Sequence, residues 1–175
     1  MKVLTGHTIH LRALEPEDLS FLYHLENDEE VWQVSGTQTP YSRHILCNYL
    51  ENAKQDIYEA KQLRLAICTP SESMVGMIDI YDFDPCHLRC GLGIVIAPAR
   101  HRGKGYAKEA LTLMMKYCQQ HLHLNQVYAA VGQHNTTSQR LFTHLGFDCS
   151  GVRKKWNRIG DTFEDELLYQ HIYVH

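Results

Sequence analysis

The sequence has no long apolar segment, no excess of basic residues and no C-x-x-C pair of cysteines. The lack of a run of about 18 apolar residues argues against a membrane-spanning helix. Acidic residues at Glu15, Asp18 and Glu26 interrupt any secretory leader. A formal net charge of −3 argues against a dedicated nucleic-acid-binding protein. We therefore expect one cytoplasmic domain over residues 1–175, with neither a membrane nor a nucleic acid as its partner.

Metal-ligand spacing is also missing, although the chain contains 6 cysteines and 12 histidines. The nearest approaches are His121 with His123, and Cys86 and His87 with Cys90, and neither matches a known zinc pattern. Without an export signal, the cysteines are expected to be reduced thiols. The sequence therefore predicts no metal site.

What the sequence does contain is a regular order of apolar patterns that predicts a mixed α+β domain. Alternating or continuous apolar segments predict strands, and apolar residues three or four positions apart predict helices. Strands are expected at 8–13, 63–69, 74–83, 91–97, 127–131, 148–156 and 162–173. Helices are expected from Pro16 onward, over 40–60, over 106–120 and over 135–145. No repeat or linker divides the chain.

A basic, glycine-rich turn precedes the helix expected at 106–120. The free N–H groups and the dipole of a helix start favour an anion, and Gly103 and Gly105 allow close approach of phosphate oxygens. A Walker loop is excluded because Lys104 is followed by glycine rather than Ser or Thr, and no dinucleotide fingerprint follows a strand. We expect a phosphate site here; the alternative is a basic helix start without a ligand.

Two segments resemble the signatures of the GCN5-related N-acetyltransferases, the GNAT superfamily. Arg102-Gly-Lys-Gly-Tyr-Ala107 matches [RQ]-x-x-G-x-[GA], and Arg100-His-Arg-Gly-Lys-Gly105 matches it in a second register. We prefer the first register because the helical pattern begins at Tyr106. The second motif of the family resembles the segment from Asn135 to Phe147. In layout the chain is most similar to the bacterial spermidine/spermine N-acetyltransferases, whose G-x-x-E-x-x-E segment resembles Gly76-Met-Ile-Asp-Ile-Tyr-Asp82.

The resemblance implies a GNAT fold: a central, mixed, mostly antiparallel twisted sheet with a splayed pair of parallel strands and flanking helices. It also implies acetyl-CoA as co-substrate, held by strand backbone along its pantetheine arm and by loop amides at its pyrophosphate. The residues implied in binding it are Ile94, Val95, Ile96, Arg102, Gly103, Lys104, Gly105, Tyr106, Ala107, Lys108, Asn135 and Ser138. Asn135 has an alternative use as the cap of the helix that it begins.

The implied reaction is direct transfer of the acetyl group to a primary amine. An alkylamine has a pKa of about 10, so the site must accept a proton before the amine can attack. The general acid of the family is commonly a tyrosine, but Phe142 stands at that position and is chemically inert. Water, Tyr128 or Cys149 remain as proton donors for the leaving thiolate.

The general base also departs from the family, because a glutamate that many members carry is missing from the segment 89–93. Asp79 is the best replacement, since a carboxylate within an apolar strand is costly without a role or a partner. A structural pairing of Asp79 with Arg89 or Arg64 is the alternative.

For the acceptor, Trp32, Asp79 and Asp82 are the expected contacts. Strict alternation puts the two aspartates on opposite faces of a strand, so they can share a pocket only if a bulge intervenes. The segment 31–40 lacks acidic residues, which weakens the expectation of a polyamine acceptor. Protein N-termini, amino acids and antibiotic amines remain alternatives, as do a non-catalytic acyl-CoA-binding module and an interaction protein. The edges of the closing hairpin are free for self-association into a homo-oligomer.

Overall fold

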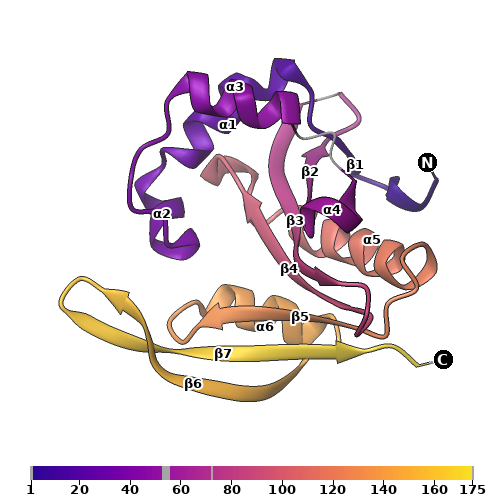
Figure 1. Ribbon diagram of the computed structural model, residues 1–175, viewed down its shortest axis with the longest axis vertical. Coiled ribbons are helices and arrows are strands. Elements are labelled where there is room, and N and C mark those ends of the chain that lie inside the picture. Colours follow the sequence, from indigo (N-terminus) through magenta and orange to yellow (C-terminus); the bar gives the residue numbers. More distant parts are fainter. Residues whose placement is uncertain (1, 53–55, 72, 175) are drawn as a thin grey trace.

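The fold is built on one seven-stranded sheet, seen in a computed structural model that describes residues 2–52, 56–71 and 73–174 (Figure 1). The strand order is β1-β2-β3-β4-β5-β7-β6. The strands are β1 (His10–Ala13), β2 (Leu63–Cys68), β3 (Met74–Asp84), β4 (Arg89–Ile96), β5 (Gln126–Gly132), β6 (Asp148–Ile159) and β7 (Thr162–Ile172). Neighbouring strands pair antiparallel except for β4 and β5, which are parallel. This arrangement confirms the expected mixed α+β sheet with one parallel pair.

Helices flank the sheet on both faces (Figure 1). They are α1 (Leu19–Glu26), α2 (Glu29–Ser35), α3 (Arg43–Asn52), α4 (Ile57–Ala60), α5 (Tyr106–Gln120) and α6 (Thr136–His144). Short 3₁₀ turns lie at 2–4, 16–18 and 99–101. No helix among these described residues is both long and apolar enough to cross a membrane.

The prediction between residues 27 and 60 was wrong in two respects. Helix α2 was not expected, although the Asp28 side chain caps it by accepting from the Glu30 amide at 2.9 Å and Gly36 ends it with a φ of 72°. The single helix expected over 40–60 consists of α3 and α4, which are separate elements because Asp56 caps a new helix start. Residues 53–55 lie outside the described part of the chain.

Alternation along β3 divides the core into two apolar clusters, one on each face of the sheet. Ile78 and Ile80 point toward α5, where they join the larger cluster. Met77 points to the other face and packs with Leu22 and Leu46 of α1 and α3. Side chains of β3 with the parity of Met77 therefore lie on the face that carries α1 and α3, which we call the front face.

A buried carboxylate attaches the start of α1 to the first strand. Asp18, 7% exposed, receives both terminal nitrogens of Arg12 at 2.7 and 2.8 Å and the Glu15 amide at 2.9 Å. Burial alone would raise the pKa of Asp18, but the hydrogen bonds from Arg12 and Glu15 together lower it below its usual value. The charged form is thus the one that the fold stabilises.

We expect Asp18→Asn to lower the free energy of unfolding by about 2 kcal/mol at pH 7, measured by urea denaturation. Because the pKa of Asp18 is depressed in the folded state, its contribution is present above the unfolded pKa of about 4 and is lost as the pH falls through the folded value. The gap between wild type and variant should therefore shrink in acid. The exposed neighbour Glu17 gives a matched control: Glu17→Gln should change stability by less than about 0.5 kcal/mol. A gap for Asp18→Asn that does not depend on pH would contradict this explanation.

Candidate active site

The parallel strands β4 and β5 pair over only three positions and then separate. Arg89, Cys90 and Gly91 pair with Gln126, Val127 and Tyr128, and no later residue of β4 is paired with β5. Figure 1 shows the two strands diverging from this point toward their carboxyl ends. The expected splayed pair is confirmed. Because β4 continues to Ile96, one side of its backbone beyond Gly91 lacks a strand partner and can bind an extended ligand.

The basic turn that follows β4 has the backbone geometry of an anion cradle. Gly103 and Gly105 have φ values of 75° and 85°, a region that glycine enters without strain. Gly105 is the N-cap of α5, so the free amides of the first helical turn follow directly. A Cβ built on either glycine meets no atom within 4 Å, which shows that the cradle opens to solvent. The residues present thus fit a bound pyrophosphate.

Basic side chains surround this cradle. Arg102 donates from Nε to the Ile96 carbonyl oxygen at 3.2 Å and lies 3.3 Å from the Glu30 carboxylate of α2, which fixes it between the end of β4 and α2. Lys104 is exposed. Lys108, in the first turn of α5, contacts Nε2 of His144 on α6 at 2.9 Å. This link between the two helices was not predicted from the sequence.

At the start of α6, Asn135 acts as the helix N-cap, which was the alternative role considered for it. Its side-chain oxygen accepts from the Ser138 amide at 3.1 Å. Phe142 is 3% exposed and packs against Phe147 and Tyr169, with ring centroids 5.1 and 6.4 Å apart. The position of the family's acid therefore holds a core side chain.

Asp79 pairs with Arg64, one of the two structural partners that the sequence had left as alternatives. Arg64 donates from Nε to Asp79 at 2.5 Å and from Nη1 to Glu26 of α1 at 2.6 Å. Its guanidinium also lies over the ring of Tyr49, 5.8 Å from the centroid. The ion pair offsets the cost of placing Asp79 in the sheet. Arg89, the other partner considered, pairs with Asp84 instead.

Trp32 is connected to the Arg64–Asp79 pair through Glu26 of α1. Its indole nitrogen donates to the Glu26 carbonyl oxygen at 2.6 Å, and Glu26 also binds Arg64. Trp32, Glu26 and Asp79 are thus linked on the front face of the sheet. Arg64 had been considered as a partner of Asp79, but the sequence missed Glu26, because the contact between α1 and β2 depends on tertiary packing.

A β-bulge brings Asp82 to this face as well. The register between β3 and β4 shifts between Tyr81 and Asp84, and Asp82 has a φ of 48°. Its carboxylate accepts from the Tyr128 hydroxyl at 3.2 Å, across the point where β4 and β5 separate. Burial and the nearby Asp82 charge raise the pKa of Tyr128 above its usual value. The bulge that a shared pocket required is therefore present.

Tyr81 was not considered from the sequence, although alternation with Asp79 put it on the same face. Its ring packs edge-on against Tyr128, with centroids 5.8 Å apart. A Cβ on Gly91 would overlap this ring, so the glycine leaves the space that Tyr81 fills. Cys149, named as a donor, lies exposed on β6, two strands away from β5 in the sheet.

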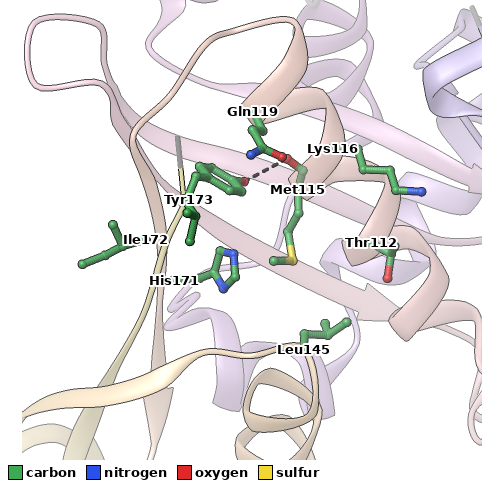
Figure 2. A pocket seen from close by; sticks show the side chains of 9 residues that line it. Thr112, Met115, Lys116, Gln119, Leu145, His171, Ile172 and Tyr173 are labelled. Atoms are coloured by element: carbon green, nitrogen blue, oxygen red, sulfur yellow. Dashed lines mark hydrogen bonds between the residues drawn. The ribbon is translucent and has the colours of Figure 1, made fainter.

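A separate hollow of about 350 Å³ lies between α5, the loop after α6 and the end of β7 (Figure 2). Met115, Leu145 and Tyr173 line it, and the Tyr173 hydroxyl donates to the Met115 carbonyl oxygen at 2.8 Å. Lys116 and His171 are its basic side chains and no carboxylate lines it, so it does not fit a cationic acceptor. Across the described ranges, no group of three or more His, Cys, Asp or Glu residues is placed to hold a metal.

The profile of the family described as the acetyltransferase (GNAT) domain matches residues 8–148. The chain belongs to the GNAT family. It is therefore an N-acetyltransferase with acetyl-CoA as co-substrate.

Two relatives and one solved structure are similar to this chain over most of its length. Spermidine N(1)-acetyltransferase of Escherichia coli K12 is 25% identical over 173 residues, which cover 97% of this chain and 90% of the relative. The Vibrio cholerae enzyme of the same name is 26% identical over 137 residues, covering 78% and 77%. A crystal structure of the Vibrio cholerae spermidine N-acetyltransferase with CoA and spermine has a TM-score of 0.86 at 22% identity and covers 95% and 96% of the two chains, which shows the shared fold.

We expect Gly105→Glu to weaken acetyl-CoA binding by at least about 100-fold in calorimetry, because it places a carboxylate against the pyrophosphate. Gly105→Ala is the matched control, since it carries the same cost of a positive φ without the charge. The alanine variant should therefore bind with an affinity between those of wild type and the glutamate variant. Equal losses in the two variants would show that strain, and not the anion site, explains the effect.

Proposed function

We propose that this enzyme acetylates a primary amine of a polycationic molecule of the polyamine class. The observation that carries the proposal is the charge of the front face around the split. Five carboxylates lie there, together with two guanidinium groups that pair with three of them. The carboxylates are those of Glu26, Asp79, Asp82, Glu164 and Glu166, and the guanidinium groups are those of Arg64 and Arg153.

Glu164 and Glu166 come to this face by the alternation of β7. Glu166 pairs with Gly132 of β5, and Glu164 covers the same glycine, whose added Cβ would overlap its carboxylate. Asp165 between them points to the opposite face and binds Lys154 at 2.7 Å. An acidic surface of this kind attracts a substrate with several ammonium groups and repels anionic competitors.

The backbone of Ile94, Val95 and Ile96 would hold the pantetheine arm, and the cradle from Arg102 to Lys108 would hold the pyrophosphate. Acetyl-CoA supplies the activated acetyl group. The front carboxylates favour binding of the ammonium form, and water in the exposed site accepts its proton before the amine attacks. Both carboxylate oxygens of Asp79 face Arg64. In this scheme Asp79 therefore acts through its negative charge, and water is the proton acceptor.

Similarity to named relatives supports the acceptor class. The relatives in Escherichia coli and Vibrio cholerae are spermidine N-acetyltransferases, and the latter was solved with spermine. A Vibrio cholerae structure at 25% identity and a TM-score of 0.79 is described as dodecameric. We propose that this chain also self-associates, through the edge strand β6, where Val152 and Trp156 are exposed. None of the 6 cysteines, all of which lie in the described part of the chain, forms a disulfide, and this supports a reducing, cytoplasmic location.

The test is release of free CoA from acetyl-CoA over a panel of amines: spermidine, spermine, putrescine, lysine, an aminoglycoside and a peptide with a free N-terminus. We expect the highest kcat/KM with spermidine or spermine. Binding of acetyl-CoA without turnover on any amine would contradict the proposal and support a non-catalytic acyl-CoA-binding protein.

The charge argument predicts a difference between acceptors. Asp82→Asn and Glu166→Gln should each lower kcat/KM for spermidine about fivefold, with a smaller loss for a monoamine of similar length. Asp165→Asn provides a control on the same strand but on the opposite face, and should stay within about twofold of wild type. Equal losses for both amines would argue against recognition of the second charge.

A further inference from the structure

The position at which the family's acid is expected holds Phe142, a core side chain, so the charge that develops on the acetyl donor needs another stabilising group. Tyr81 reaches the split from β3. A Cβ on Gly91 would overlap its ring, and a Cβ on Gly93 would lie 3.9 Å from its Cε1 atom. The ring therefore lies across two consecutive front-face positions of β4, both of them glycines.

The far edge of the same ring faces β5. Tyr81 packs edge-on against Tyr128, the last residue of β5 that pairs with β4. The backbone of Ala130, two residues further along β5, is near enough to lower the pKa of its hydroxyl group. Tyr81 thus extends from β3 across β4 toward β5, and its hydroxyl group lies where the two strands begin to separate.

The hydroxyl keeps its proton at neutral pH. Burial raises the pKa of Tyr81 to about 12; the backbone of Ala130 lowers it, whereas the charges of Asp82 and Glu166 raise it. A thiol has a pKa of about 8.5, so the phenol holds its proton more strongly than a thiolate would take it. A hydrogen bond is therefore the favoured interaction with a departing sulfur, and complete proton transfer is not.

We propose that Tyr81 is a catalytic residue whose hydroxyl group donates a hydrogen bond to the sulfur of CoA as the thioester bond breaks. This assignment rests on the proposed acetyl transfer. The amine nitrogen forms a bond to the acetyl carbon, the carbon–sulfur bond breaks, and the sulfur leaves with the electron pair. The nitrogen, which gave one proton to water before its attack, gives a second to water on the acidic face, and the thiolate later takes a proton from water. A preorganised donor near developing charge accelerates such a step.

The first test is Tyr81→Phe, which keeps the ring over Gly91 and removes only the hydroxyl group. We expect kcat to fall about 30-fold or more, with the Kd of CoA in calorimetry within about twofold of wild type. Tyr117→Phe is the control, because it removes a half-buried phenol hydroxyl from α5 and should leave kcat within about twofold. Full activity of Tyr81→Phe overturns the assignment, and a loss in Tyr128→Phe alone would move the role to Tyr128.

A second readout does not depend on turnover. The thiol of CoA bound without an acetyl group can be titrated by the ultraviolet absorbance of its thiolate. A donor at the sulfur stabilises the thiolate, so Tyr81→Phe should raise the pKa of the bound thiol by about one unit. A lower kcat with an unchanged thiol pKa would overturn the assignment, because the hydrogen bond of Tyr81 would then not go to the sulfur.

If Tyr81→Phe fails to fold, two glycines provide the test. Gly91→Ala forces the ring away, whereas the methyl group of Gly93→Ala lies 3.8 and 3.9 Å from its nearest neighbours, which are ordinary contacts. The assignment predicts a much larger loss of kcat for Gly91→Ala, and equal losses would overturn it. If the unaltered protein shows no turnover, the proposed function and the assignment both fail. If it turns over but the variants behave otherwise than expected, the assignment alone fails.

Discussion

The organising constraint of this structure is the short parallel pairing of β4 with β5, which ends at Gly91 and Tyr128. Beyond that point β4 carries backbone groups without a strand partner, and a buried backbone group needs a partner. A ligand with an extended amide-containing arm can supply it. The cradle at Gly103 and Gly105 follows directly along the chain, so one substrate can engage both features.

At the split, the two faces of the sheet carry different kinds of side chain. The face toward α5 is filled by the apolar core, which includes Phe142. The front face carries carboxylates and two tyrosines, and its interior glycine, Gly91, makes room for the ring of Tyr81. The missing glutamate and the missing tyrosine acid of the family thus coincide with a different set of polar groups, supplied by β3, β5 and β7. The proposed acetyl transfer to a polycationic amine depends on how those groups are brought together.

Much of the fold was predictable from the sequence, because the alternating or continuous apolar segments of the strands and the apolar stripe of α5 are strong local signals. The cradle was also predictable, since Gly103 and Gly105 need positive φ values that few other residues adopt. The Arg64–Asp79 pair was an alternative stated from the sequence. The part of Glu26 in that pair, the Lys108–His144 contact and the position of Tyr81 were not predicted, because each joins elements that are distant in sequence. Helix α2 was missed even though Asp28 and Gly36 marked its ends, since the segment between them was interpreted only as a possible acceptor site.

The most direct test of the account is backbone hydrogen exchange with and without acetyl-CoA. If the split and the cradle form one donor site, the amides of Ile94 to Ile96 and of Gly103 to Tyr106 should gain protection together, while the hollow near Met115 and Tyr173 stays unchanged. Protection confined to that hollow, or to the cradle without β4, would contradict the account, because the separation of β4 from β5 would then have no part in binding the acetyl donor.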